Sequence, residues 1–284
     1  MAIIALRAWY LESYEPLREL ERRPHDLRLS KNSLLKSALR ADFLDDLETV
    51  KQSAWFARYL DGETVEFYIE GSGGYAIANI DLNSQEIYFT KRDVSAQLEP
   101  TIFLALQSDL PISTLGELLL KDDPKSKNLQ ESSLALRQEL TELLEELNTR
   151  SRIPLTITEL LPETNAPLRP NAVLLRQIRR SLLFIADGTA IDLGTDDHRA
   201  VLSPAIGLTL GYALGVKKPE QILVIQQQGR LSTIESYENV IVEAFPFDLP
   251  SHQHRYWHNL PELRSKLQTV LIENLRRFRL WPEG

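Results

Sequence analysis

The stretch that decides the fold is Ser181-Leu-Leu-Phe-Ile-Ala-Asp-Gly-Thr189. Its run of apolar residues before Asp187 predicts a buried strand that ends on a carboxylate. After a gap, Ser203-Pro-Ala-Ile-Gly-Leu-Thr-Leu-Gly-Tyr-Ala-Leu-Gly215 predicts a loop that leads into a helix rich in small residues. In doubly wound α/β folds, ligands bind at such junctions, at the carboxyl ends of the strands. These residues therefore predict an α/β fold with a binding site at this strand end.

Strands and helices alternate on both sides of this stretch. We expect strands at residues 101–106, 153–161, 182–186, 221–226 and 240–245, and helices at 131–148, 171–180, 204–214 and 259–280. Such alternation predicts parallel strands with helices on both faces of the sheet. Residues 98–284 are therefore expected to form a flavodoxin-like α/β domain.

Three of these helices carry clear signals. The helix at 131–148 has one apolar stripe, made of Leu136, Leu140, Leu143, Leu144 and Leu147. Asn171 is expected to cap the next helix, and Asn259 the last one, with Glu262 as the reciprocal partner in a capping box. The last helix is expected to bury Leu263, Leu267, Val270, Leu271, Leu275 and Phe278.

Residues 1–97 predict a smaller α+β domain. We expect a strand at 2–10, a short helix capped by Ser13 with Pro16 in its first turn, and a helical region from 33 to 60, broken near Asp42. On one face of that region lie Val50, Ala54, Trp55 and Tyr59. An antiparallel meander follows at 63–70, 75–82 and 86–90, with Val65, Phe67 and Ile69 on one face of its first strand.

Composition limits the classes of function. The 284 residues suffice for two domains, and 43% of them are hydrophobic and 25% charged, as in ordinary globular proteins. The formal charge of −8 argues against sequence-independent binding of DNA or RNA. The absence of cysteine excludes disulfides, thiolate catalysis, iron–sulfur clusters and cysteine zinc sites. No run approaches the roughly 18 apolar residues of a membrane span, and the start does not read as a signal peptide, so we expect a cytoplasmic protein without membrane contact.

The second half resembles a known superfamily. Ile185-Ala-Asp-Gly-Thr189, Ser203-Pro-Ala-Ile206 and Thr209-Leu-Gly-Tyr-Ala213 are similar to the motifs of TIR-like nucleotide-binding proteins and nucleoside 2-deoxyribosyltransferases. In that group a strand ends in an Asp-(Leu/Gly)-Thr-like turn, followed by Asn-Pro-Asn-Val and then Glu-Leu-Gly-Tyr-Ala. The resemblance covers residues 98–284 and implies a nucleotide or nucleoside ligand.

Two departures from that pattern bear on catalysis. Ser203 and Ala205 stand where the superfamily has asparagines. Thr209 stands where active members have the glutamate that performs glycosidic-bond chemistry. The resemblance therefore implies a fold and a pocket, and not strong catalysis. In the first half, Arg22-Arg-Pro-His-Asp-Leu-Arg-Leu-Ser30 and Glu66-Phe-Tyr-Ile-Glu-Gly-Ser-Gly-Gly-Tyr75 are similar to phrases in uncharacterised cyanobacterial proteins, which implies lineage and no chemistry.

The candidate ligand-binding residues lie on the strand end and the helix that follows. They are Asp187, Thr189, Ser203, Ala205, Gly207, Thr209 and Tyr212. Amide groups at the start of the helix can face an anion, and Asp187 can accept ribose hydroxyls. Gly207 and Gly211 would let a ligand or a neighbouring helix approach the backbone. The structural alternative is that Asp187 caps a turn and that Gly211 and Ala213 only permit close packing of the helix on the sheet.

A carboxylate could replace the lost glutamate. Asp187 is the weak candidate for a catalytic role, and Asp192, Asp196 and Asp197 lie near it in the sequence. Residues 192–198, however, read as an exposed, charge-rich insertion, so a solvated loop is the simpler interpretation.

Other clusters have structural explanations. His252, His254 and His258 could bind a metal, but they follow Pro250 and precede the last helix, so a surface loop is the better interpretation and no metal site is predicted. Gly71-Ser-Gly-Gly74 lacks the lysine of a phosphate loop and is expected to be a hairpin turn. Residues Phe245 to Pro250 are expected to cross the top of the sheet as one wall of the pocket, with Tyr256 or Trp257 near a base. Arg176, Arg179 and Arg180 are either a solvated helix end or contacts for a phosphate.

Three functions are therefore open. The first is a nucleotide-binding or sensing protein of a degenerate N-glycosidase-like fold, without strong catalysis. The second is an N-glycosidase or deoxyribosyltransferase that acts on NAD or nucleosides through a displaced carboxylate. The third is an interaction or assembly factor without a ligand, in which apolar surface joins a homodimer or another protein. The sequence does not identify the ligand or any cofactor.

Overall fold

The structure is a computed structural model and describes residues 5–30, 34–36, 39–106, 124–159, 170–193, 200–228, 245–246 and 248–282. The chain divides into two compact units, Met1–Glu99 and Pro100–Gly284, two residues beyond the predicted boundary. Each unit is described by itself. Among the described residues, no helix has the length and apolar character that crossing a membrane requires.

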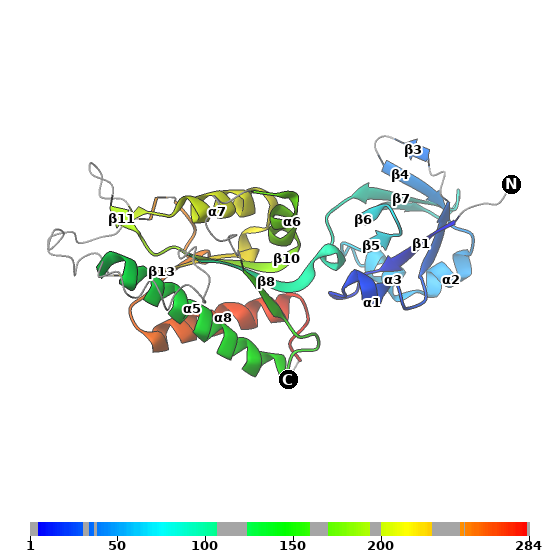
Figure 1. Cartoon of the computed structure of the whole chain (residues 1–284). Coiled ribbons are helices and arrows are strands. Elements are labelled where there is room, and N and C mark those ends of the chain that lie inside the picture. The colour runs from blue at the N-terminus through cyan, green and yellow to red at the C-terminus, as the bar shows by residue number, and fades with distance from the viewer. Residues whose placement is uncertain are drawn as a thin grey trace. The chain divides into compact units, whose positions relative to one another are not determined.

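The first unit contains an antiparallel sheet of seven strands (Figure 1). Its strand order is β2-β1-β5-β6-β7-β4-β3, and every neighbouring pair runs antiparallel. The strands are β1 (Ala5–Tyr10), β2 (Leu27–Ser30), β3 (Leu34–Lys36), β4 (Leu39–Phe43), β5 (Glu66–Ile69), β6 (Gly73–Asp81) and β7 (Glu86–Lys91). The predicted meander is β5-β6-β7, and its inward residues Val65, Phe67 and Ile69 are buried as expected.

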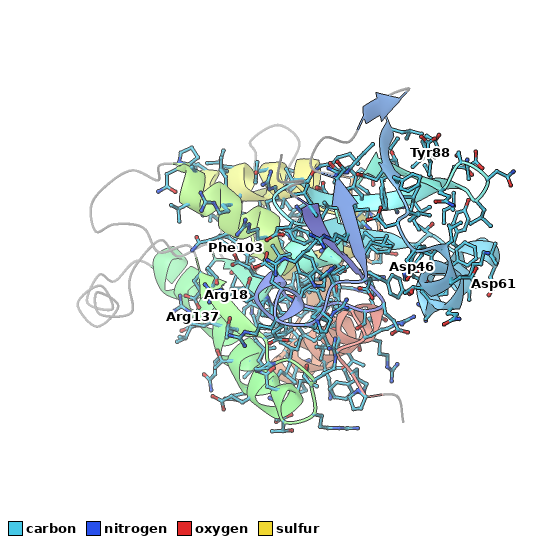
Figure 2. The ribbon with its side chains drawn as sticks, turned by 90° about the vertical axis from the view of Figure 1, so that its right-hand side faces the viewer. Arg18, Asp46, Asp61, Tyr88, Phe103 and Arg137 are labelled. Carbon is cyan, nitrogen blue, oxygen red and sulfur yellow. The ribbon has the colours of Figure 1, made fainter. Side chains whose placement is uncertain are left out.

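Three short helices and a 3₁₀ turn complete this unit: α1 (Leu17–Leu20), α2 (Leu47–Gln52), α3 (Ala54–Leu60) and η1 (Ser95–Gln97). Asp46 caps α2, because its carboxylate accepts the amide protons of Glu48 and Thr49. Figure 2 shows Asp46 and Asp61 at opposite ends of the α2–α3 segment. Trp55 and Phe56 point from α3 into the core.

Two sequence predictions in this unit are wrong. The region 33–43 forms strands β3 and β4 instead of a helix, because β4 pairs with β7 over residues 40–43. The first helix begins after Pro16, so Ser13 does not cap it. On the predicted helical face of 50–59, Ala54 is exposed while Val50 and Trp55 are buried.

The antiparallel sheet curves enough to bring β2 and β4 together, although they are not neighbours in the sheet. The Ser30 amide donates to Asp42 Oδ1 (3.1 Å), and Arg40 Nη2 donates to the Ser30 carbonyl (2.9 Å). Arg40 Nε also lies 2.6 Å from Asp42 Oδ2, and both side chains are buried. The buried ion pair of Arg40 and Asp42 thus joins β4 to β2.

The second unit is a parallel sheet of five strands with the order β14-β13-β10-β8-β9. The strands are β8 (Glu99–Ala105), β9 (Thr156–Glu159), β10 (Ser181–Asp187), β13 (Ile222–Gln227) and β14 (His254–Trp257). Strand β8 runs parallel to β9, β10 to β13, and β13 to β14. The predicted parallel α/β class is confirmed at this level.

Helices cover both faces of the parallel sheet. Figure 1 shows α6 (Ala172–Arg180) and α7 (Pro204–Val216) on one face, and α5 (Pro124–Asn148) and α8 (Leu260–Arg277) on the other. Asn171 and Asn259 cap α6 and α8, as predicted. Glu262 departs from the expected capping box, since its carboxylate accepts the amide proton of His258 and not that of Asn259. The predicted stripes of α5 and α8 are buried, apart from the half-buried Phe278.

The prediction for the residues around strand β14 is also wrong. Residues 252–258 were expected to be a surface loop, whereas His254–Trp257 forms the edge strand beside β13. The strand predicted at 240–245 lies outside the described residues except for Phe245, which is in no regular element. A small two-stranded sheet, β11 (Asp192–Leu193) with β12 (Ala200–Val201), stands where an insertion was expected. The 3₁₀ turn η2 (Pro219–Gln221) precedes β13.

Candidate functional site

The site begins at Asp187, the last residue of β10. Its side chain is almost fully buried, at 1% exposure. Ser133 Oγ on α5 donates to Asp187 Oδ2 at 2.7 Å, and the Thr189 amide donates to Oδ1 at 3.0 Å. Asp187 therefore caps the turn that follows β10 and fixes this turn to α5.

Thr189 continues this network. Its Oγ1 lies 3.1 Å from Ser132 Oγ and accepts the amide proton of Gln227 at 3.1 Å. The Gly188 amide donates to the Ile225 carbonyl at 2.8 Å. The turn 187–189 is thus bonded to both α5 and β13, so it is a rigid part of the site.

Gly188 is required by packing. A Cβ atom at this position would lie 2.6 Å from Val224 Cγ1 and 3.1 Å from the Phe245 ring. A real Cβ does not come so close to a neighbouring carbon, so any other residue would displace one of them. The glycine brings Phe245 against the end of β10.

The two residues that the sequence analysis placed in one pocket lie on opposite faces of the sheet. Phe184 and Ala186 pack in one core cluster with Ile206 and Leu210 of α7. Side chains alternate along a strand, so Asp187 points to the other face, where Ser133 of α5 meets it. Thr209 belongs to α7. The structure therefore does not bring Asp187 and Thr209 together.

The remaining predicted residues lie on α7 or just before it. Ser203 caps the helix, with Oγ accepting the Ile206 amide proton at 3.3 Å. Ala205 is buried. Thr209 is 1% exposed, and its hydroxyl donates to the carbonyl of Ala205 at 2.8 Å, within its own helix. Tyr212 is half-buried against the core cluster.

Among the described residues, no other element packs closely on the glycines of α7, so the predicted approach of a ligand or a neighbouring helix to Gly207 and Gly211 stays a prediction. A Cβ atom at Gly207 or Gly211 would meet nothing within 4 Å, apart from the helix's own nearby backbone. The same holds for Gly215, and the side chain of Leu208 is 43% exposed. This side of α7 therefore faces open space.

An aromatic cluster occupies the α7 face of β13 and β14. The ring of His254 lies 4.4 Å from that of Phe245 and 4.5 Å from that of Tyr256, measured between centroids. His254 Nε2 is 3.0 Å from Oε1 of the buried Gln226, and these two atoms form a hydrogen bond. Burial lowers the pKa of His254 to about 4, and the imidazole is therefore neutral at pH 7.

The sequence predicts this arrangement only in part. Phe245 and Tyr256 were expected near the pocket, but His254 was assigned to a loop. The alternation of His254 and Tyr256 on one side of a short strand is the signal that could have found it. Phe245 and Tyr256 are half-buried, so the exposed parts of their rings can stack on a planar heterocycle.

The other candidates fall elsewhere. Asp192 lies in β11, while Asp196 and Asp197 lie outside the described residues. His258 is exposed, with Nδ1 3.1 Å from Glu262 Oε2. Within the described ranges, no three His, Cys, Asp or Glu residues are grouped to hold a metal ion. Arg179 and Arg180 end α6 immediately before β10, so they lie at the amino edge of the sheet, away from Asp187.

The comparisons with known proteins add little to this description. No family model matches the sequence, and no curated protein does. One solved structure, the metal-soaked Flv1 flavodiiron core from Synechocystis sp. PCC6803, shares 17% sequence identity with a TM-score of 0.30. The match covers 64% of this chain and 36% of that one.

Proposed function

We propose that the second unit binds a nucleotide or nucleoside on the α7 face of its sheet, and that it does not cleave the glycosidic bond. The observation that carries this proposal is the aromatic cluster of Phe245, His254 and Tyr256 beside the Gly188 turn. Stacking of a base on aromatic side chains contributes about 1–3 kcal/mol per base.

The strand order supports a site of this kind. Numbered in chain order, the strands of the parallel sheet are arranged 2-1-3-4-5. This is the order of flavodoxin-like folds, which bind ligands outside the carboxyl ends of their strands. The proposed fold is therefore flavodoxin-like, related to the TIR-like and deoxyribosyltransferase-like proteins that the motifs resemble.

The geometry of two residues favours binding over cleavage. Asp187 is buried on the α5 face and accepts hydrogen bonds from Ser133 and Thr189. Thr209 carries no carboxylate, and its hydroxyl is bonded within α7. A nucleophile or an acid must come within contact distance of the reacting atom, which neither residue does on the α7 face.

Calorimetric titration of the full chain with NAD, cyclic nucleotides and nucleosides tests the proposal. We expect at least one of them to bind, and Tyr256→Ala to weaken binding about tenfold or more, since about 1.4 kcal/mol corresponds to a factor of ten. The matched control is Tyr88→Ala, which removes a half-buried tyrosine from β7 in the first unit. If no ligand binds at millimolar concentration, or Tyr256→Ala binds as well as the unaltered protein, the proposal is wrong.

Product analysis separates binding from turnover. NAD and nucleosides incubated with the protein should remain intact. If they are cleaved, Asp187→Asn decides whether the displaced carboxylate is responsible: loss of cleavage would support the N-glycosidase alternative with Asp187, and unchanged cleavage would remove Asp187 from the mechanism.

A second candidate function is assembly of two copies along α7. The outward side of this helix carries the exposed side chains of Leu208, Leu214 and Val216 beside Gly211 and Gly215. Close helix contact across a two-fold axis would bury these residues. Sedimentation over a range of protein concentrations should then show a dimer that Leu208→Arg dissociates, and a monomer at every concentration would reject this function.

A further inference from the structure

In the first unit, two cations lie near the phenol ring of Tyr75 on β6. Lys91 is its partner across the β6–β7 pair, and Lys91 Nζ lies 4.4 Å from the ring centroid. The guanidinium carbon of Arg40 lies 6.0 Å from the same centroid. Tyr75 is half-buried and Lys91 is exposed, so solvent reaches this cluster.

The charge of Lys91 is not neutralised within the described part of the unit. Its ammonium donates to the carbonyl of Ser72 and contacts the Tyr75 ring, and it forms no ion pair with a described carboxylate. Arg40 has a carboxylate partner, Asp42. The cluster therefore carries an excess positive charge.

The phenol of Tyr75 responds to this charge. Burial raises the pKa of the phenol, but the hydrogen bond with Ser72 and the charges of Lys91 and Arg40 together outweigh burial and lower the pKa. Both charges acting on the ring are positive, which agrees with an uncompensated cation beside it.

Hydrogen-bond donors converge on Gly73, the first residue of β6 after the turn from β5. Gly73 has φ +97°, and a Cβ atom there would lie 3.0 Å from Lys91 Nζ and 3.4 Å from Gln97 Nε2. Gln97 Oε1 accepts the Val94 amide proton, which directs Nε2 towards the turn. The absence of a Cβ thus lets both the ammonium and the amide approach the Gly73 backbone.

A hydroxyl completes the group of donors. Ser72 Oγ and the Tyr75 hydroxyl lie 2.7 Å apart. One of these hydroxyls donates to the other, so the acceptor of this bond keeps its own hydrogen for a further partner. Ammonium, amide and hydroxyl donors therefore surround one turn of the backbone.

We propose that this turn, together with Lys91, Gln97 and Tyr75, binds the phosphoryl group of a small ligand. A phosphoryl group presents three acceptor oxygens in different directions, which suits three donors of different kind, and its negative charge offsets that of Lys91. The site lies wholly within the first unit. It is independent of the nucleotide site proposed in the second unit.

Amide NMR of the ¹⁵N-labelled full chain tests the site with inorganic phosphate as the probe. Phosphate is added at constant ionic strength, with chloride as the balancing anion. We expect saturable shifts of the Gly71, Gly73 and Gly74 amides and of the Gln97 side-chain amide. Lys91→Met should weaken the binding by about tenfold or more, the factor that corresponds to loss of a charged hydrogen bond.

The matched control is Lys51→Met, which removes an exposed lysine on α2 and makes the same change in net charge. It should leave phosphate affinity unchanged. The proposal is overturned if phosphate causes no saturable shift, if chloride alone causes the same shifts, or if Lys91→Met and Lys51→Met bind phosphate equally well.

A second measurement does not depend on the folding of Lys91→Met. Bound phosphate places negative charge beside Tyr75, so it should raise the pKa of this phenol. The ultraviolet absorbance of phenolate, taken as the difference between the unaltered protein and Tyr75→Phe, follows this group alone. If phosphate does not change the pKa of Tyr75 in this difference titration, the proposal is also overturned.

Discussion

In the antiparallel sheet the buried carboxylate of Asp42 lies beside a cation, whereas in the parallel unit the buried ammonium of Lys217 donates to a carbonyl. Arg40 Nε is 2.6 Å from Asp42 Oδ2. Lys217 Nζ is 2.5 Å from the carbonyl oxygen of Ser181, and it has no other partner among the described residues. Burial lowers the pKa of Lys217 to about 7.

The difference follows from where each residue lies in its element. Arg40 and Asp42 are two residues apart on β4, so they share one face of the strand and form a pair. Lys217 follows α7, and its partner carbonyl belongs to Ser181, the extended residue that caps α6 and begins β10. A neutral carbonyl gives only part of the compensation that a carboxylate gives. Removal of the Arg40 cation should therefore destabilise the first unit, whereas removal of the Lys217 cation should stabilise the second.

The largest effect is expected from Arg40→Met. This change leaves Asp42 buried without its cation, and breaking a buried pair in this way costs about 3–5 kcal/mol. Urea unfolding, followed by the fluorescence of the buried Trp9 and Trp55, measures the loss. Arg40→Met combined with Asp42→Leu should recover part of it, because no buried charge remains. A loss below about 1 kcal/mol, typical of an exposed pair, would contradict this account.

Lys217→Met should instead raise the free energy of unfolding. The pKa of Lys217 falls from 10.5 to about 7 on folding. Between these values the unfolded chain holds a proton that the folded chain lacks, so stability rises with pH across this window and is lowest below it. At about 1.4 kcal/mol per pKa unit, the fall from 10.5 to about 7 corresponds to about 5 kcal/mol. Less about 1 kcal/mol for the hydrogen bond to Ser181, removal should gain roughly 4 kcal/mol at pH near 6.

The measurement is the free energy of unfolding as a function of pH. Lys217→Met should remove the rise in stability from about pH 7 to 10.5. Lys218→Met, at the exposed neighbouring position, is the control and should keep that rise. If both variants keep it, Lys217 is not the uncompensated buried cation described above.

Gly188→Ala should produce a smaller loss, through packing and not through charge. The added methyl group would lie 2.6 Å from Val224 Cγ1, and overpacking of this kind costs about 1–3 kcal/mol. Gly211→Ala is the matched control, since its methyl group would meet nothing within 4 Å outside the helix's own nearby backbone. It should stabilise α7 by up to about 1 kcal/mol. Equal melting temperatures for the two variants would contradict the packing role of Gly188.

The sequence predicted the parallel unit better than the antiparallel one. Buried parallel strands are continuous apolar runs, and Leu182 to Ala186 is one of them. In the antiparallel sheet, β4 carries Arg40 and Asp42 on its inner face. Polar residues are normally expected on an exposed face, so this stretch was predicted to be a helix with these residues outside. Strand β14 was missed because its four residues begin with His254 and follow a turn. Only pairing with β13, distant in sequence, identifies it as a strand.

The candidate site was predicted in its parts and not in its arrangement. The strand end at Asp187, the turn and the helix after Ser203 are where the motifs placed them. Which face of β10 meets which helix depends on the path of the whole chain, and this decides that Asp187 meets Ser133 and not α7. Whether the predicted residues contact a ligand stays a prediction.

The smallest effect is expected at Thr209, where the superfamily that the motifs resemble has its catalytic glutamate. The Thr209 hydroxyl donates only to carbonyls of its own helix, at Ala205 and Ile206, which also belong to the backbone ladder. Thr209→Val removes the hydroxyl at nearly constant volume, so the free energy of unfolding should change by less than about 0.5 kcal/mol. Ser133→Ala makes a similar deletion but takes a donor from the buried Asp187, and should cost about 1–3 kcal/mol. Urea unfolding of both variants, with calorimetric titration of any ligand that binds, checks this contrast. If Thr209→Val loses as much stability as Ser133→Ala, or loses ligand affinity, then the hydroxyl serves the site and not only its helix.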